Sequence, residues 1–240
     1  MVYQNQGTNR TEGETMDNKQ RRDSRMLYRT DDELMAQQAR ARKLTQKLNT
    51  MDRSDFEGIM KVVSELLCTD GPAFVNPPFY CDYGFNIEVG KHFFCNYNCT
   101  ILDVGKVKIG DNCLFAPNVS IYTAGHPVHP AMRNTYYEYG IDVTIGNNVW
   151  LGGNVVVCPG VTIGDNVVVG AGSVVTKDIP SWTVAAGNPC RVIRKITQKD
   201  MEFYFKDMRP DDEAAEEIKR MIEEKNDPDT FPESPYKSFR

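Results

Sequence analysis

Residues 145–176 read Ile145-GNNVW-Leu151-GGNVV-Val157-CPGVT-Ile163-GDNVV-Val169-GAGSV-Val175-Thr176, and they place an apolar residue at every sixth position. A small residue follows most of these positions, and a β-branched residue usually lies four positions beyond each. The same pattern occurs upstream at Ile109, Phe115 and Ile121. A period of six with this composition predicts a parallel β-helix built from hexapeptide repeats.

Each hexapeptide is expected to form a short strand followed by a corner. The apolar residue points into a prism, and Asn or Gly accepts the positive φ that a corner can require. One coil cannot bury its own inner face, so successive coils must stack. A β-sandwich of alternating strands is the alternative, and six consecutive repeats in phase argue against it. The fold class expected is therefore mainly β.

The segment before the repeats differs in composition. Residues 1–25 are polar and irregular, which predicts a disordered tail. Residues 26–72 carry helical signals: Thr30 with Glu33 and Ser54 with Glu57 have the spacing of capping boxes, each followed by apolar residues on one helical face. Gly71-Pro72 is expected to end this region, so the β-helix domain is assigned to residues 73–196.

Within the β-helix the period fails over 122–143, which predicts a long loop on a rigid scaffold. Such loops often carry function. After the repeats, 184–196 is expected to close the β-helix, and residues 197–240 form a C-terminal extension and tail. Apolar residues on one face predict a late helix over 211–225.

Composition excludes several classes of protein. The chain has 240 residues and a net charge of −5, which disfavours a general nucleic-acid or membrane-surface binder. No apolar run approaches the ~20 residues of a membrane span, and the first 25 residues lack the apolar core of a secretory signal. The seven cysteines are odd in number and scattered, without a Cys-x-x-Cys pair. They indicate a reducing compartment, the cytoplasm, rather than a disulfide framework.

The chain has three histidines, His92, His126 and His129, and a general base that works near neutral pH is most readily drawn from them. His126 lies in the aperiodic loop, in Thr123-Ala-Gly-His126-Pro127. From this position it could serve as a base facing a cleft between subunits, or it could be an ordinary polar loop residue.

Longer motifs surround this histidine: Asn118-VSIYTAGHPVH-Pro130, Ile145-GNNVWLG-Gly153, Pro159-GVTIGD-Asn166 and Val184-AAGNPCRVI-Arg194. Together with Leu27-Tyr28-Arg29 they resemble the maltose and galactoside O-acetyltransferase family, over about residues 27–196. The resemblance implies a left-handed β-helix and a homotrimer whose active sites lie between subunits. It also implies acetyl-CoA as co-substrate and a sugar hydroxyl as acceptor.

The resemblance assigns His126 as the general base. The neutral imidazole would take the hydroxyl proton as the oxygen attacks the thioester carbonyl, and a backbone N–H near Gly153 would stabilise the oxyanion. The transfer is direct, so neither a covalent enzyme intermediate nor a metal is required. The cysteines then need no catalytic role, and core packing is the better interpretation for most of them.

Residues that match acceptor-contacting positions of the family are Asp32, Asp82, Asn96, Asp103 and Glu138. Carboxylates suit sugars because each oxygen accepts hydrogen bonds from hydroxyls. Asp31 competes with Asp32 for its position, and both could be first-turn helix residues; Asp82 and Asp103 could instead stabilise turns. Residues that match acetyl-CoA-binding positions are Asn96, Trp150, Gly153, Ala171, Thr176, Lys177, Arg191 and Arg194. The two arginines suit phosphates, or could form a solvated basic edge.

Three other functions remain open. A β-helical metalloenzyme like the β-helical carbonic anhydrases would need all three histidines to converge on one metal ion. A non-catalytic β-helix could serve as an assembly scaffold, although the match at His126, Asn96 and Trp150 argues against this. An acetyltransferase for serine or a xenobiotic would have a similar donor site.

Overall fold

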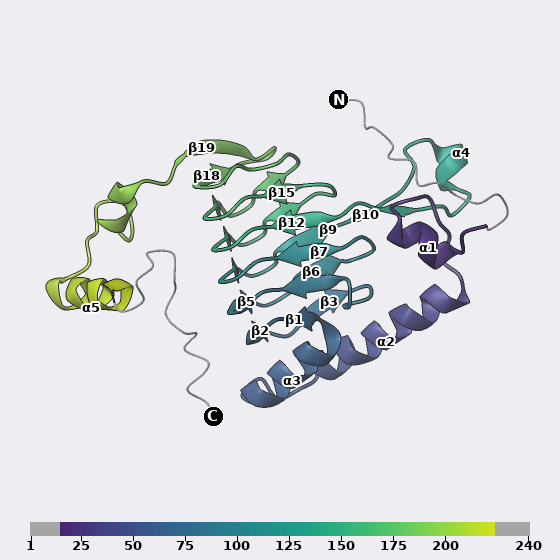
Figure 1. Ribbon diagram of the computed structural model, residues 1–240, viewed down its shortest axis with the longest axis horizontal. Coiled ribbons are helices and arrows are strands. Elements are labelled where there is room, and N and C mark those ends of the chain that lie inside the picture. Colours follow the sequence, from purple (N-terminus) through teal and green to yellow (C-terminus); the bar gives the residue numbers. More distant parts are fainter. Residues whose placement is uncertain (1–14, 224–240) are drawn as a thin grey trace.

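The computed structural model describes residues 15–223, and stacked coils of a parallel β-helix form its centre (Figure 1). The coils build a three-sided prism. Face 1 contains β1 (Cys68–Thr69), β4 (Ile87–Val89), β7 (Val107–Ile109), β12 (Val143–Ile145) and β15 (Thr162–Ile163). Face 2 contains β2 (Ala73–Val75), β5 (Phe93–Cys95), β8 (Leu114–Phe115), β13 (Trp150–Leu151), β16 (Val168–Val169), β18 (Thr183–Ala186) and β19 (Arg191–Lys195). Face 3 contains β3 (Phe79–Cys81), β6 (Cys99–Leu102), β9 (Ser120–Tyr122), β14 (Val156–Val157) and β17 (Val174–Val175).

The chain visits the three faces in turn, so each strand pairs in parallel with strands of the coils above and below it. Trp150, for example, aligns with Leu114 on one side and Val168 on the other. Among the described strands of the three faces, β19 alone runs antiparallel, against β18, and it closes the stack. The predicted mainly β architecture of stacked hexapeptide coils is therefore confirmed.

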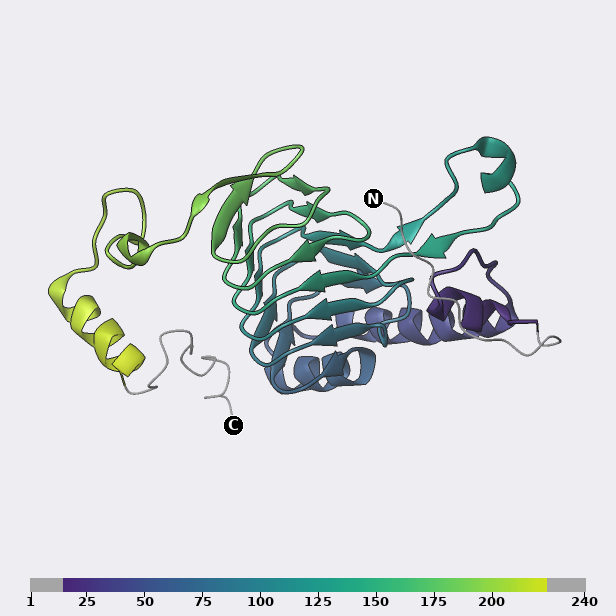
Figure 2. The same cartoon turned by 45° about the horizontal axis from the view of Figure 1, so that its top comes forward.

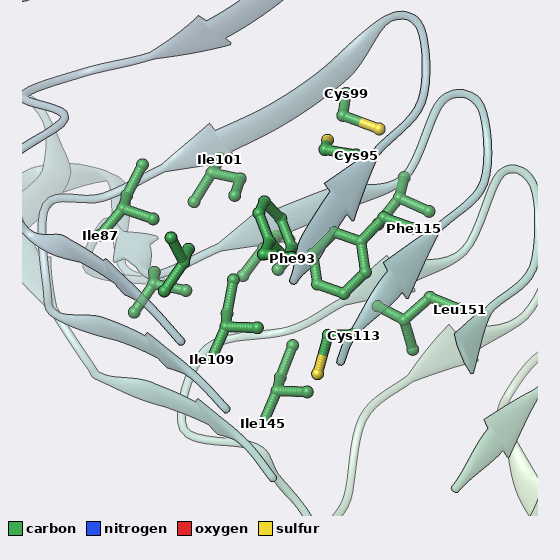
Figure 3. Close-up of a cluster of buried hydrophobic side chains, with 14 of the residues drawn as sticks. Ile87, Phe93, Cys95, Cys99, Ile101, Ile109, Cys113, Phe115, Ile145 and Leu151 are labelled. Atoms are coloured by element: carbon green, nitrogen blue, oxygen red, sulfur yellow. The ribbon is translucent and has the colours of Figure 1, made fainter. Parts of the chain in front are cut away.

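The interior of the prism is filled by the apolar residues that occur at every sixth position of the sequence. Ile145, Leu151 and Val157 come from three different faces and are all buried. Figure 3 shows Ile145 and Leu151, with labelled side chains of neighbouring coils, pointing into the prism. Phe93 and Phe115 meet edge to face, with ring centroids 5.1 Å apart, a geometry that aromatic pairs prefer.

The corner residues explain the rest of the motif. Asn148 and Asn166 have positive φ, and Asn148 donates a side-chain hydrogen bond to Asn166 one coil away at 2.7 Å. Gly146 is small for another reason: a Cβ there would lie 2.8 Å from the backbone of Gly164 in the next coil. Close stacking of coils, rather than unusual φ, therefore selects this glycine.

Helices cover the first coils of the prism. α2 (Asp32–Asn49) and α3 (Phe56–Leu66) pack against each other and close the core, with Leu48, Ile59 and Val63 buried. Both helices begin one residue later than the predicted capping boxes. Asp31 and Asp55 are the N-caps, and their carboxylates accept from Leu34 N and Gly58 N. The boxes at Thr30 and Ser54 were therefore wrong, because an aspartate follows each and takes the cap.

The predicted disordered tail was wrong for its last part. α1 (Asn18–Asp23) is a short helix capped by Asp17, and it lies beside the start of α2 and the 122–143 loop (Figures 1 and 2). Residues 1–14 lie outside the described residues. The β-helix also begins before residue 73, since β1 already pairs with β4.

The C-terminal extension leaves the prism after β19. It contains a 3₁₀ turn at Gln198–Met201 and α5 (Asp212–Glu223), which stands apart from the prism (Figure 2). α5 agrees with the predicted late helix, whose last two residues lie outside the described part. Among residues 15–223, no helix is both long and apolar enough to span a membrane.

Candidate active site

Two edges of the prism carry most of the predicted site residues. We call the edge between faces 3 and 1 the loop edge, because the 122–143 loop leaves the prism there. Its corners follow β3, β6, β9, β14 and β17, and they hold Asp82, Asp103, Thr176 and Lys177. We call the edge between faces 2 and 3 the turn edge. Its corners follow β5, β13 and β16, and they hold Asn96, Gly153 and Ala171.

The 122–143 loop is an ordered hairpin rather than an irregular excursion. β10 (Ala124–Gly125) and β11 (Tyr139–Gly140) pair antiparallel at its base, and α4 (Pro130–Arg133) lies at its tip (Figure 2). Beneath it lies a pocket of about 650 Å³. The lining residues are Arg29, Thr30, His126, Arg133, Asn134, Tyr136 and Glu138.

The three histidines have different positions and contacts in the structure. His126 directly follows β10, is solvent-exposed and lines the pocket. His129 caps α4, because its Nδ1 accepts from Ala131 N at 3.2 Å. His92 occupies a positive-φ corner between faces 1 and 2, on a different edge from the loop. Of the three histidines, His126 is therefore the one that lines this pocket.

The histidines do not converge as a shared metal site would require, since His92 belongs to another edge. Within residues 15–223, no group of three or more His, Cys, Asp or Glu side chains is arranged to hold a metal ion.

Glu138 joins the loop to the segment before α2. Its backbone exchanges two hydrogen bonds of 3.0 Å with Tyr28, and its carboxylate accepts from the Thr30 hydroxyl at 3.0 Å. Tyr28 is completely buried, and burial together with the nearby Glu138 charge raises its pKa. The predicted acceptor residue Glu138 thus lies in the same pocket as His126.

Asp82 and Asp103 form a carboxylate pair one coil apart on the loop edge. Asp103 is 0% exposed, and its Oδ1 accepts from the backbone N–H groups of Asp82 and Tyr83 at 2.9 Å each. Its Oδ2 is buried without a hydrogen-bond partner. Asp103 therefore shapes the corner that carries Asp82, which is the turn-stabilising role weighed from the sequence.

Asp82 itself is half-buried. Burial, followed by the charges of Asp103 and Glu138, raises the pKa of Asp82 to about 6. A carboxyl group held in this way near other acids is typical of functional sites, although structural clusters also show it. Neither Asp82 nor Asp103 belongs to the lining of the His126 pocket, so they add a second group of acids on the same edge.

Asp32 is the first residue of α2 and is exposed, while Asp31 is the N-cap. The Asp31 carboxylate accepts from Leu34 N at 3.1 Å and from Asn18 Nδ2 at 3.0 Å. These hydrogen bonds lower the pKa of Asp31. The structure thus assigns Asp31 to the helix start, and it places Asp32 beside the pocket-lining segment Arg29–Thr30.

Two of the predicted donor residues, Trp150 and Arg194, lie in an outward row on face 2. The strand register aligns Leu114, Trp150, Val168, Val184 and Arg194. Leu114 and Trp150 are 47% and 52% exposed, so this row is an apolar surface that ends in a cation. Such a surface fits a long ligand with an apolar arm and phosphates, as coenzyme A has.

Arg194 already makes several contacts. Its guanidinium forms a two-pronged ion pair with Asp200, with N–O distances of 2.7 and 3.0 Å, and also donates to Lys195 O at 3.0 Å. Arg191 donates to Cys190 O at 2.7 Å. Arg194 therefore also anchors the start of the C-terminal extension.

The turn edge is compact and smooth. Gly153 and Ala171 lie in consecutive coils, and Gly172 N donates to Gly153 O at 2.8 Å. A Cβ added at Gly153 would approach only Pro117 O, at 3.4 Å, so there is space beside this backbone. Asn96 lies on the same edge, where its Oδ1 accepts from Tyr97 N at 2.8 Å.

Sequence reasoning missed several pocket residues. Arg29 and Thr30 reach the pocket only because Tyr28 pairs with Glu138, a long-range contact with no periodic signal. Arg133 and Tyr136 belong to the aperiodic loop, whose position was predicted but whose inner surface was not. Arg133 donates to Val128 O at 2.7 Å and so stabilises the turn after His126.

Comparisons with known proteins agree with this architecture. Residues 142–177 match the bacterial transferase hexapeptide repeat, and residues 23–71 match the maltose acetyltransferase hexapeptide capping motif. The galactoside O-acetyltransferase of Escherichia coli is 49% identical over 171 residues, which cover 71% of this chain and 84% of that protein. A putative acetyltransferase of Saccharomyces cerevisiae is 53% identical over 154 residues, covering 63% of this chain and 78% of that protein.

Solved structures give the same result. A maltose O-acetyltransferase from Clostridium difficile aligns with a TM-score of 0.75 at 49% identity, covering 76% of this chain and 99% of that one. A galactoside acetyltransferase in complex with coenzyme A aligns with a TM-score of 0.79 at 44% identity, covering 82% of this chain and 100% of that one. The chain belongs to the maltose and galactoside O-acetyltransferase family of hexapeptide-repeat proteins.

Proposed function

We propose that this protein transfers the acetyl group of acetyl-CoA to a sugar hydroxyl, with His126 as the general base. Family membership makes it an acetyltransferase with acetyl-CoA as co-substrate. The observation that carries the proposal further is the pocket in which exposed His126 lies with Glu138 and Thr30. Hydroxyl and carboxylate groups around an imidazole suit a polyhydroxyl acceptor, because they can orient it by hydrogen bonds.

The proposed chemistry needs no covalent enzyme intermediate. The neutral imidazole of His126 removes the proton of the acceptor hydroxyl while the oxygen attacks the thioester carbonyl. The oxyanion receives a hydrogen bond from a backbone N–H near Gly153. It then collapses to the acetyl ester as the C–S bond breaks, and the thiolate of CoA takes up the proton that His126 removed. The open space beside Gly153 supports this placement, because a ligand atom can approach the backbone there.

The residues proposed for the active site lie on two different edges of one chain. His126, Asp82, Asp103, Thr176 and Lys177 belong to the loop edge, whereas Asn96, Gly153 and Ala171 belong to the turn edge. Face 3 lies between them. A ligand that touches both groups must either cross face 3 or lie between two copies of the chain.

We propose the second arrangement, a homotrimer in which each active site combines the loop edge of one subunit with the turn edge of the next. Closed cyclic symmetry then generates three equivalent sites. The half-exposed Leu114 and Trp150 on face 2 support this arrangement, because an apolar row of this kind is typical of a surface that a ligand or a partner covers.

Hybrid assemblies test the shared site. His126→Ala disables the loop edge, and Gly153→Trp blocks the turn edge while its Cβ is accommodated by the backbone. Each variant alone should be nearly inactive. Co-refolded in equal amounts, they should recover roughly one quarter of wild-type activity, because random mixing joins two intact edges in that fraction of interfaces. A mixture that stays inactive, with mixed trimers confirmed by mass spectrometry, would place the whole site in one chain.

An acceptor panel tests the substrate class. Acetyl-CoA is supplied with glucose, maltose, galactosides, amino sugars, serine and chloramphenicol, and released CoA is measured. Turnover restricted to sugars supports the proposal. Turnover of serine or chloramphenicol alone would favour a non-sugar acetyltransferase, and no turnover at all would favour a scaffold.

We also place the protein in a reducing compartment such as the cytoplasm. All seven cysteines are free thiols, and Cys95, Cys99 and Cys113 are part of the buried core. Burial raises the pKa of Cys113 to about 12, which keeps this thiol protonated and unreactive.

A further inference from the structure

The helix α1 precedes the segment that matches the family's capping motif, which begins at residue 23. It is nevertheless an ordered element with a complete capping box at Asp17 and Gln20. A six-residue helix is too short to be stable alone, so its order depends on contacts with the rest of the molecule. Those contacts lead to three parts of the loop edge.

The first contact is made by Asn18. Its side-chain Oδ1 accepts from Arg29 N at 3.1 Å, and its Nδ2 donates to Asp31 Oδ2 at 3.0 Å. Asn18 therefore spans the two ends of the segment Arg29–Asp31. The residue between them, Thr30, bonds Glu138, and both Arg29 and Thr30 line the His126 pocket.

The second contact is made by Arg22. Although charged, this residue is only 2% exposed, and its guanidinium lies 4.5 Å from the centre of the Tyr83 ring. It also donates to Gln37 at 3.0 Å. Tyr83 directly follows Asp82, and its backbone N–H bonds Asp103. Arg22 thus packs α1 against the corner that carries the carboxylate pair.

The third contact lies at the end of α1, where Arg25 forms an ion pair with Asp142. Asp142 follows β11 and accepts from Lys106 N at 2.9 Å, at the base of the loop. One short helix therefore touches the pocket rim, the acidic corner and the base of the loop.

We propose that α1 is a specificity element of the acceptor pocket, and that Asn18 is the positioning residue through which it holds the pocket rim. This inference rests on the proposed function, since it treats the His126 pocket as the acceptor site. Asn18 touches no reacting atom. It acts by fixing Arg29 and Thr30, so its loss should weaken acceptor binding and leave acetyl-CoA binding unchanged.

The pair Asn18–Asp31 permits a reciprocal exchange. Asn18→Asp still accepts from Arg29 N but places a second carboxylate against Asp31. Asp31→Asn still caps α2, because Asn and Asp are about equally good N-caps. Its side-chain NH₂ then faces the NH₂ of Asn18, however, so the hydrogen bond between the two side chains is lost. The double variant keeps the hydrogen bond from Arg29 N and restores the bond between positions 18 and 31, with its donor and acceptor exchanged. Each single variant should raise the acceptor KM by about five- to tenfold, the effect of one lost hydrogen bond.

The measurement is the acceptor KM and the acetyl-CoA KM of wild type, both single variants and the double variant, with thermal unfolding in parallel. The double variant should return to within about twofold of the wild-type acceptor KM, and the acetyl-CoA KM should stay constant throughout. Lys19→Ala on the same helix removes only an exposed ion pair with Glu33 and is the control, expected to change nothing.

Three results would overturn the inference: single variants with unchanged acceptor KM, a double variant as impaired as the singles, or acceptor and donor KM values that rise together with a falling Tm. The last result would mean that α1 only stabilises the fold. Failure of the proposed function looks different, because the wild-type protein would then acetylate no sugar.

Discussion

The loop edge and the turn edge are built from the same hexapeptide repeat, yet they differ in every property that matters for chemistry. The turn edge consists of small residues such as Gly153 and Ala171 in tightly stacked corners. The loop edge is interrupted by a hairpin and carries Asp82 and the fully buried Asp103. A regular edge supplies a smooth groove for a long ligand, whereas an interrupted edge supplies a pocket with reactive groups.

The most direct way to break this comparison is to remove the base from the loop edge. His126→Ala should lower kcat by roughly 10²–10⁴, the range for a lost general base, with little change in acetyl-CoA affinity. His129→Ala is the matched control in the same loop, because it removes only the cap of α4. Steady-state kinetics with a good acceptor measure both. Near-normal kcat in His126→Ala would mean that the base lies elsewhere.

The second test concerns the structural half of the carboxylate pair. Asp103→Ala leaves the buried N–H groups of Asp82 and Tyr83 without an acceptor and should lower the free energy of unfolding by about 2–4 kcal/mol. Asp103→Asn keeps the accepting oxygen and should cost less than about 1 kcal/mol. Urea denaturation measures both. Equal losses in the two variants would show that the charge, not the oxygen, stabilises this corner.

The third test separates function from stability at Asp82. The folded-state pKa is about 6, above the usual 3.8, so the folded state favours the protonated carboxyl. This group therefore makes the folded state progressively less stable as pH rises from about 4 to 6, and the loss is complete at higher pH. Asp82→Asn replaces the ionisable carboxyl with a neutral amide, so this pH-dependent loss of stability disappears. It should raise the free energy of unfolding by about 1–2 kcal/mol at pH 8, after allowance for solvent screening, and by much less at pH 4.5.

The same variant should be less active. If Asp82 accepts a hydrogen bond from the sugar, Asp82→Asn should lower kcat/KM for the acceptor by an amount equivalent to about 1–3 kcal/mol of transition-state stabilisation. The slow hydrolysis of acetyl-CoA without sugar should be unaffected. A variant that is both more stable and less active would identify a functional carboxylate. Unchanged kcat/KM would limit Asp82 to a structural role.

The smallest expected effect concerns the cationic end of the donor row. Arg191→Ala and Arg194→Ala should each raise the KM for acetyl-CoA several-fold, because a phosphate loses one charged hydrogen-bond donor. An acetyl-pantetheine donor, which lacks the nucleotide phosphates, should be much less sensitive. Arg194→Ala also removes the ion pair with Asp200, so equal effects on both donors would indicate that this arginine mainly orders the C-terminal extension.

The hexapeptide period alone determined the prism, its buried residues and the position of the loop. Ile145, Leu151 and Val157 could be assigned to the interior because each repeat meets the same environment one face later. The sequence also singled out His126, through its place in the one long break of that period and through the family resemblance, and its role as the base stays a prediction. Helix starts were displaced by one residue, because Thr30-Asp31 and Ser54-Asp55 each offer two competing caps.

Only the tertiary structure decided which segments outside the repeats pack against the edges of the prism. It ordered α1 through Arg22 and Asn18, whose partners Tyr83 and Asp31 give no sign of these contacts in a local pattern. It also distinguished Asp103, which binds backbone from a buried position, from Asp82, which keeps access to solvent. The physical reason is that a repeat encodes contacts between adjacent coils, whereas the pocket depends on contacts between segments more than 100 residues apart, such as Thr30 and Glu138.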